Sequence, residues 1–246
     1  MSNARRLIPL TVTTTAMPRP AILEQTFLSL RNRLLGCDLC CSQLLINIDP
    51  YPDRRADDER LHCLAIASRY FGSVQFRLPD YPNFALALKW LWQSTSSSFV
   101  FHLEDDWEFL DYVKLDEIFH HIYRANCDHL MLRAWTWRNY PFCLGPGVLR
   151  RRLYNFCAGT LTGAANPEAE LRTALSKTTY SGLVFPAARN RVVLRDLGRS
   201  WMRSSGYVRG EGDFITWTKE TPANRSAQDR LADQNLELLK GSGYPK

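Results

Sequence analysis

The sequence lacks any apolar run close to the ~20 residues that a membrane-spanning helix requires. Behind Arg5 and Arg6, near the N-terminus, no apolar segment reaches the length of a signal peptide. Internal repeats and low-complexity tracts are also missing, and the composition is that of an ordinary globular protein. From these absences we expect a protein without a transmembrane segment that stays in the cytoplasm.

The cysteines do not suit a disulfide framework, because the chain has seven of them and no secretory signal. Cys37, Cys40 and Cys41 would supply one half of a zinc site. Structural zinc sites need four ligands, in most cases as two close pairs, and His62 with Cys63 makes a poor second half. We therefore expect reduced, structural thiols.

The net charge of +6 is unevenly distributed along the chain. Residues 147–209 hold eleven Lys and Arg against three acids, a net +8, which leaves −2 for the rest. Such asymmetry favours an anionic ligand, substrate or surface on the C-terminal side. A solvated basic face is an equally good interpretation of the same charges.

Strands alternate with helices through the first hundred residues, a pattern that predicts an α/β fold with a mostly parallel sheet and helices on both faces. Ligands of such sheets bind at the carboxyl ends of the strands. Polar residues follow three of these ends, at Thr13 to Thr15, at Asp49 and after residue 103. The expected strands are 7–15, 43–48, 73–78 and 99–103, and the expected helices are 21–35, 57–70 and 84–93, the last capped by Asn83.

The second half of the chain is less regular. Pro167 suits the first turn of a helix, because this position does not need to donate an N–H. After Thr216 the composition becomes polar, which predicts a surface tail. The expected elements are helices over 116–124 and 167–175, strands over 129–133 and 191–195, and a Pro/Gly-rich loop over 140–147.

The most informative stretch is an apolar strand that runs directly into Glu104, Asp105 and Asp106. Three adjacent carboxylates repel one another, and a divalent cation shared with a diphosphate would offset that repulsion. Alternatively, one aspartate caps a helix that begins at Trp107, although capping needs only one acid. The alternation of the strand places Phe99, Phe101 and Leu103 on one side and Val100, His102 and Glu104 on the other.

This order of elements, with the acidic triplet after the fourth strand, resembles the GT-A glycosyltransferases, whose acidic DxD motif matches residues 104–106. The resemblance implies a single GT-A-like, Rossmann-related domain that uses Mn²⁺ or Mg²⁺ and a nucleotide-sugar donor, with a UDP-sugar favoured. The nucleotide-sugar-binding half of the family corresponds to residues 1–110 here. We expect the acceptor-binding half of the same domain over 111–216 and a polar tail over 217–246.

The same resemblance implies roles for particular residues. Asp106 would ligate the metal, and Asp196 takes the place of a histidine that completes the metal shell in many family members. An aspartate is also a competent ligand for a hard cation. The donor-binding residues implied by the resemblance are Thr13, Thr14, Asp49, Glu104 and Asp105, of which the last two would hold the ribose or a metal-bound water.

An inverting transfer also needs a carboxylate base, and a retaining transfer does not. Glu168 and Glu170 are the first candidates, at the start of the 167–175 helix, where they would equally well complement the helix dipole. Glu211 and Asp213 are further candidates.

An acceptor should lie against the arginine-rich half, where Trp135, Arg150, Arg199 and Trp201 are the candidate contacts. Arginine forks suit phosphates, and aromatic rings suit sugars or bases. Two anionic acceptors fit: nucleic acid with a hydroxyl-modified base, as in phage DNA modification, and a phosphorylated glycan.

Three other functions compete with glycosyl transfer. A nucleotidyltransferase needs a Gly-rich phosphate loop, and residues 13–20 contain no glycine. A metal-dependent nuclease suits clustered carboxylates beside a basic half, but its carboxylates come from several elements in most cases. A non-catalytic binding protein would need no metal.

Overall fold

The computed structural model describes residues 10–51, 54–133, 142–164, 166–209 and 217–219. The chain divides into two compact units, residues 1–198 and residues 199–246. Each unit is described by itself.

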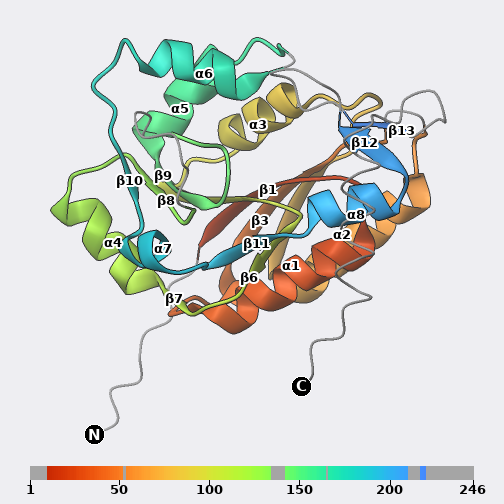
Figure 1. The fold of residues 1–246 in the computed structure, drawn as a ribbon, viewed down its shortest axis with the longest axis horizontal. Coiled ribbons are helices and arrows are strands. Elements are labelled where there is room, and N and C mark those ends of the chain that lie inside the picture. Colours follow the sequence, from red (N-terminus) through yellow and green to blue (C-terminus); the bar gives the residue numbers. More distant parts are fainter. Residues whose placement is uncertain (1–9, 52–53, 134–141, 165, 210–216, 220–246) are drawn as a thin grey trace, which may run out of the picture. The chain divides into compact units, whose positions relative to one another are not determined.

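The first unit is built on a seven-stranded sheet in the order β10-β8-β9-β5-β1-β3-β4 (Figure 1). All neighbouring strands are parallel except β9, which runs antiparallel to β5 and to β8. The strands are β1 (Thr11–Ala16), β3 (Gln43–Ile48), β4 (Ser73–Arg77), β5 (Phe99–Glu104), β8 (His129–Met131), β9 (Gly147–Arg150) and β10 (Gly182–Val184).

Helices cover both faces of the sheet because the central strands are apolar on both sides. In β3, Ile46 belongs to one buried cluster, with Phe27 and Ile66, and the adjacent Leu45 belongs to another, with Leu91. The first cluster involves α1 (Pro20–Arg33), α2 (Asp57–Tyr70) and α4 (Leu115–Arg124), and the second involves α3 (Phe84–Gln93), α5 (Arg151–Thr160) and α6 (Pro167–Leu175).

A short antiparallel ribbon joins distant parts of the chain beside the sheet. Strand β6 (Trp107–Phe109) pairs with β11 (Leu194–Asp196), so that Trp107 lies opposite Asp196. The remaining elements of the first unit are β2 (Leu34–Leu35), its parallel partner β7 (Val113–Lys114), the 3-10 turn η1 (Leu39–Cys41) and α7 (Pro186–Asn190).

The second unit contains most of α8 (Gly198–Ser204) and an antiparallel pair, β12 (Tyr207–Arg209) with β13 (Trp217–Lys219). Strand β13 falls within the segment 217–246 that was expected to be a polar tail. Residues 220–246 lie outside the described part of the chain.

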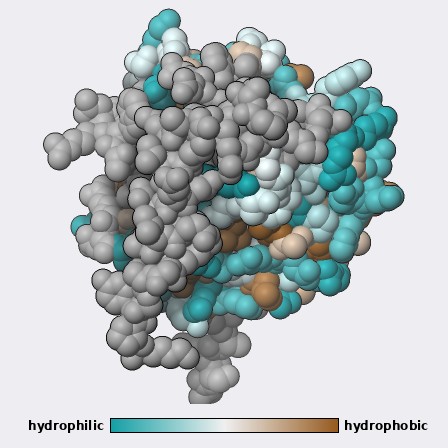
Figure 2. Space-filling view, turned by 45° about the vertical axis from the view of Figure 1, so that its right-hand side comes forward, coloured by the Kyte–Doolittle hydropathy of each residue, from teal (hydrophilic) through white to brown (hydrophobic). Residues whose placement is uncertain are grey.

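The surface of the described residues is mostly hydrophilic on the face shown in Figure 2, with hydrophobic side chains gathered near the centre of the view. None of the helices in the described ranges is long and apolar enough to cross a bilayer. The longest helices, α1 and α2, have 14 residues each.

The structure confirms the α/β fold class and most of the expected elements. Three differences bear on the site. The expected strand 7–15 is described only from Thr11 and continues to Ala16. Trp107 begins strand β6 and not a helix, so the capping interpretation of the acidic triplet is wrong. The sequence pattern also gave no indication of β9 or α5, which follow the expected loop 140–147.

Candidate active site

The acidic triplet lies at the carboxyl edge of the sheet, where strands β1, β3 and β5 end side by side. Thr15 on β1 pairs with Glu104 on β5, and Asp49 follows the last residue of β3. Because the three strands are parallel and adjacent, these polar residues gather at one edge. The sequence predicted polar, ligand-binding groups after these strands, and the structure brings the three strand ends to one edge of the sheet.

A buried arginine neutralises part of the acidic triplet. Arg19 donates from Nε to Asp105 Oδ2 at 3.1 Å and from Nη2 to Asp105 Oδ1 at 2.5 Å. The same Nη2 also donates to Asp106 Oδ2 at 3.0 Å. The side chains of Arg19 and Asp105 are each only 4% exposed, so this two-point ion pair is almost fully removed from water.

Asp105 is held by the backbone as well. Its Oδ2 accepts from the backbone N–H of Met17 at 3.2 Å, and its carbonyl oxygen accepts from the hydroxyl of Thr26 at 2.6 Å. With both carboxylate oxygens engaged by Arg19 and Met17, Asp105 connects β5 to the loop after β1. This contact stabilises the edge of the sheet.

Sequence reasoning missed Arg19, although its position offered a signal. Arg19 immediately precedes Pro20, the first residue of α1, at a helix N-terminus where a cation is disfavoured by the helix dipole. A buried arginine in that position needs carboxylate partners, and the acidic triplet supplies them.

The β6–β11 ribbon brings Asp196 beside Asp106. The N–H of Leu197 donates to the carbonyl oxygen of Asp106 at 2.8 Å. Burial raises the pKa of Asp106 above its ordinary value, and the nearby charges of Asp105 and Asp196 add to the rise. The Arg19 guanidinium opposes it. Two carboxylates from distant parts of the sequence, Asp106 and Asp196, thus repel each other at the edge of the sheet.

Gly198 packs directly against the same carboxylate. A Cβ added at this position would lie 1.9 Å from Asp106 Oδ2 and 3.1 Å from Arg19 Nη1. Any larger residue would force the Asp106 carboxylate to move, because real Cβ contacts are longer than 3.0 Å. The glycine therefore allows the chain after β11 to approach the acidic triplet.

Glu104 interacts with a nearby tryptophan and with a candidate base. Its Oε2 accepts from the indole N–H of Trp107 at 2.7 Å. Burial raises the pKa of Glu104, and the charges of Asp106 and Glu168 raise it further, against the effect of the Trp107 hydrogen bond. Glu168, in the first turn of α6, is thus close enough to Glu104 to influence its ionisation.

The two candidate bases differ in their surroundings. Glu168 accepts a hydrogen bond from the backbone N–H of Leu144 at 3.1 Å. Glu170 accepts from the backbone N–H of Thr162, in the segment after α5, at 3.0 Å. Glu168 is the one whose charge reaches the acidic triplet. Glu211 and Asp213 lie outside the described residues.

Thr13 and Thr14 lie inside β1 and not at its end, because the strand extends to Ala16. Both are fully buried, and the hydroxyl of Thr13 is 3.0 Å from His102 Nδ1. Asp49 does lie at its strand end. Its Oδ1 accepts from the Asn47 side chain at 2.8 Å, and burial raises its pKa.

Among the expected acceptor contacts, Arg150 lies away from this edge. Arg150 pairs with Phe99, the first residue of β5, and so lies at the opposite edge of the sheet from Glu104. Arg199 and Trp201 belong to α8, in the second compact unit. Trp135 lies outside the described residues.

The carboxylates fit a divalent cation only if another ligand completes its coordination. Within the described residues, no group of three or more His, Cys, Asp and Glu side chains is arranged to hold a metal ion. Asp106 and Asp196 alone offer two hard oxygen donors. Mg²⁺ binds proteins in this way, through one or two carboxylates together with substrate phosphates and water.

Comparison with solved structures shows the same fold in glycosyltransferases. The mannosyltransferase PcManGT from Pyrobaculum calidifontis, solved with GDP-Man and Mn²⁺, matches 81% of this chain with a TM-score of 0.55 and 10% identity. TarS from S. aureus matches 76% of the chain with a TM-score of 0.51 and 10% identity. The chain spans 64% of the first protein and 36% of the second.

These likenesses confirm a GT-A-like α/β fold, and at 10% identity they show the fold alone. No protein-family model matches the chain, and no curated protein matches it in sequence.

Proposed function

We propose that this protein is a glycosyltransferase that moves a sugar from a nucleotide-sugar donor to a hydroxyl group of an acceptor. The observation that supports it best is the placement of Asp106 and Asp196 at the carboxyl edge of a GT-A-like sheet, with Glu168 reaching the same edge from another element. Ligands of open α/β sheets bind at this edge.

The donor would lie along the ends of β1, β3 and β5. Asp49 is the proposed contact to the nucleoside, since it lies at a strand end and accepts hydrogen bonds there. Glu104 is the proposed contact to the ribose. Thr13, Thr14 and Asp105 are buried or already paired, so their proposed role is to hold the edge in place behind the donor.

Asp106 and Asp196 would hold Mn²⁺ or Mg²⁺ together with the donor diphosphate. When bound, the cation would neutralise charge that develops on the diphosphate leaving group. The nearby Asp196 carboxylate, which contributes to the raised pKa of Asp106, supports a cation site at this point.

Glu168 is the proposed base. Its carboxylate would accept the proton of the acceptor hydroxyl as the acceptor oxygen bonds to the anomeric carbon of the sugar. The bond from that carbon to the diphosphate oxygen breaks, and the nucleoside diphosphate leaves with the electron pair. Direct attack of this kind inverts the configuration at the anomeric carbon.

The proposal is tested by thermal denaturation with UDP, GDP, CMP and their sugar conjugates, each with and without Mn²⁺. A ligand at ~100 times its dissociation constant should add about 2.7 kcal/mol to the free energy of unfolding. We expect a metal-dependent rise in Tm with one nucleotide family, and its loss in Asp106→Asn. The apo Tm of this variant should stay near that of the wild type, because the raised pKa of Asp106 shows that its charge is disfavoured in the fold.

Absence of a shift with every nucleotide would contradict the proposal. Mg²⁺-dependent cleavage of plasmid DNA by the same preparation would point to a nuclease instead.

A further inference from the structure

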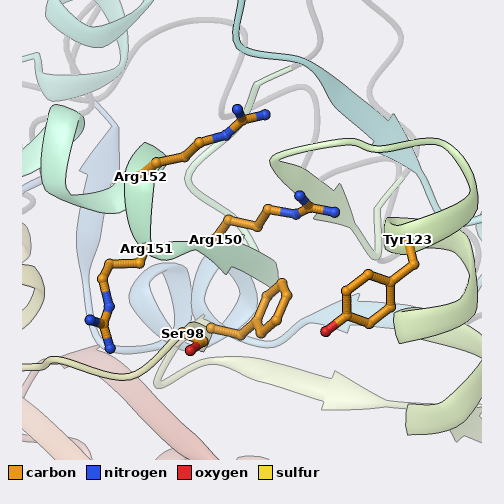
Figure 3. A pocket seen from close by; sticks show the side chains of 6 residues that line it. Ser98, Tyr123, Arg150, Arg151 and Arg152 are labelled. Atoms are coloured by element: carbon orange, nitrogen blue, oxygen red, sulfur yellow. The ribbon is translucent and has the colours of Figure 1, made fainter.

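An open cavity lies at the opposite edge of the sheet from the acidic triplet. It has a volume of about 400 Å³ and is formed where β9 leads into α5 (Figure 3). The proposed transfer chemistry does not use it. Its lining residues are Ser98, Phe99, Tyr123, Arg150, Arg151 and Arg152.

The cavity is strongly basic. Three consecutive arginines line it, and the first turn of α5 contains no acidic residue and no side-chain cap. Arg152 is paired with the buried carboxylate of Asp128, which accounts for one of the three positive charges. Arg151 is exposed and donates from Nε to the carbonyl oxygen of Ser97 at 3.2 Å. The N-terminal end of the helix dipole adds further positive potential.

Arg150 is held in a fixed orientation. Its Nη1 donates to Asn126 Oδ1 at 3.1 Å and its Nη2 donates to the carbonyl oxygen of Ile122 at 3.2 Å. Its guanidinium lies 5.7 Å from the ring centroid of Tyr123 and 5.9 Å from that of Phe99. The two rings also contact each other, with centroids 5.9 Å apart, so Arg150 lies against an aromatic pair. A guanidinium fixed in this way is preorganised for recognition of a planar or anionic group.

The three guanidinium groups do not converge on one point. In Figure 3, the Arg150 side chain extends toward Tyr123, the Arg151 side chain extends to the opposite side, and the Arg152 guanidinium ends above that of Arg150. A single small anion could not contact all three. An extended chain with an anionic group at each step could, with successive groups along the edge of the sheet.

Tyr123 provides an aromatic ring, which a chain of phosphates alone would not use. Its side chain is largely exposed, at 63%. A solvent-facing aromatic ring beside an arginine is the arrangement with which proteins stack an unpaired base and hold its phosphate. An aromatic ring can also contact a sugar, but a nucleic acid strand offers a flat base beside every phosphate, so the cavity favours a single strand over a glycan phosphate.

From these observations we infer that the Arg150–Arg152 cavity binds a single strand of nucleic acid, with Tyr123 stacking a base and Arg151 contacting a phosphate. The β5 strand separates this cavity from the acidic triplet by about 17 Å. An acceptor that occupied both places would thus have to be several nucleotides long. That the bound strand is the acceptor rests on the proposed function, whereas the binding itself does not.

The test is fluorescence anisotropy of a labelled single-stranded oligonucleotide of about 12 nucleotides with the full-length protein, over a range of salt concentrations. In Arg151→Gln we expect the slope of log affinity against log salt to decrease in magnitude by about one. In Tyr123→Ala we expect affinity to fall by about tenfold or more. The matched control is Arg69→Gln, which removes an exposed arginine that pairs with Glu24 elsewhere, and it should behave like the wild type.

Equal losses in Arg151→Gln and Arg69→Gln would overturn the inference, because binding would then follow net charge and not this cavity. Polyphosphate that competes as well as the oligonucleotide, with no effect of Tyr123→Ala, would also overturn it. Asp106→Asn should bind the oligonucleotide normally. Oligonucleotide binding without any nucleotide-sugar binding would refute the proposed function and leave this inference standing.

Discussion

Arg19 Nη2 lies 2.5 Å from Asp105 Oδ1 and also donates to Asp106, so one guanidinium holds two of the three adjacent carboxylates. Three adjacent acids suggested that a metal was needed to offset their repulsion. In the structure, Arg19 neutralises part of that charge, and the nearby Asp196 carboxylate still contributes to a raised pKa of Asp106.

Arg19→Gln should therefore destabilise the fold strongly. Removing one partner of a buried ion pair leaves an unpaired buried charge, which costs about 3–5 kcal/mol. The free energy of unfolding measured by urea denaturation should fall by that amount. The double variant Arg19→Gln/Asp105→Asn should recover much of the loss, because it leaves no charge of the pair unpaired. A single variant within 0.5 kcal/mol of the wild type, a roughly neutral change, would contradict the assignment.

Gly198→Ala should disturb the site through sterics alone. The new Cβ would meet Asp106 Oδ2 at 1.9 Å, so the carboxylate must move. We expect the metal-dependent rise in Tm with nucleotide to be lost. The control is Gly159→Ala, within helix α5, where an added Cβ meets nothing within 4 Å. That change should keep the ligand response and stabilise the protein by about 0.5–1 kcal/mol. An unaltered ligand response in Gly198→Ala would show that Asp106 is not needed in its present position.

Glu168→Gln should separate binding from turnover. The amide keeps the hydrogen bond from Leu144 but cannot take a proton from the acceptor. Once a donor and an acceptor are known, we expect kcat to fall by about 10²–10⁴-fold with nucleotide binding unchanged. Glu170→Gln is the matched variant, since Glu170 lies on the same helix and bonds to Thr162. A larger loss in Glu170→Gln would reverse the assignment of the base.

Two buried histidines should make the protein less stable in acid. Burial lowers the pKa of His102 to about 4 and that of His129 to about 3. Below pH 6.5 the unfolded chain takes up these protons while the folded protein does not, so stability is lost as pH falls from 6.5 toward the folded values. Each histidine contributes a slope of up to about 1.4 kcal/mol per pH unit in this window.

Urea denaturation of wild type and His129→Asn at several pH values between 6.5 and 4 measures this slope. The variant should show a shallower dependence, whatever its absolute stability. Equal slopes would mean that His129 is not buried in its neutral form.

The sequence predicted best those elements that begin at marked positions. Helices α3 and α6 occur over the expected residues because Asn83 caps the first and Pro167 starts the second. Strand β9 and helix α5 escaped prediction because the three consecutive arginines Arg150 to Arg152, where the strand meets the helix, interrupt the apolar pattern. Strand β9 forms because it pairs with β5 and β8, and a local sequence pattern does not reveal such pairing.

For the site, the sequence indicated the carboxylates but not their partners. Asp196 was expected near Asp106 by resemblance, and the β6–β11 ribbon does place them together. The ion pair of Arg19 with Asp105 joins residues 86 positions apart, a contact that no local pattern reveals. Thr13 and Thr14 were assigned to a strand end because the continuation of β1 to Ala16 depends on its pairing with β3.

The β6–β11 ribbon has a consequence for how such a protein could change. The N–H of Leu110 bonds to the carbonyl oxygen of Val193, so the chain leaves the acidic edge and returns to it at nearly the same point. Residues 111–192 therefore begin and end at this ribbon, which fixes both ends of the segment. Doubling the length of a flexible loop costs only about 0.6 kcal/mol of free energy. Loops within residues 111–192 could therefore be lengthened or exchanged while the β6–β11 pairing keeps Asp106 and Asp196 close together.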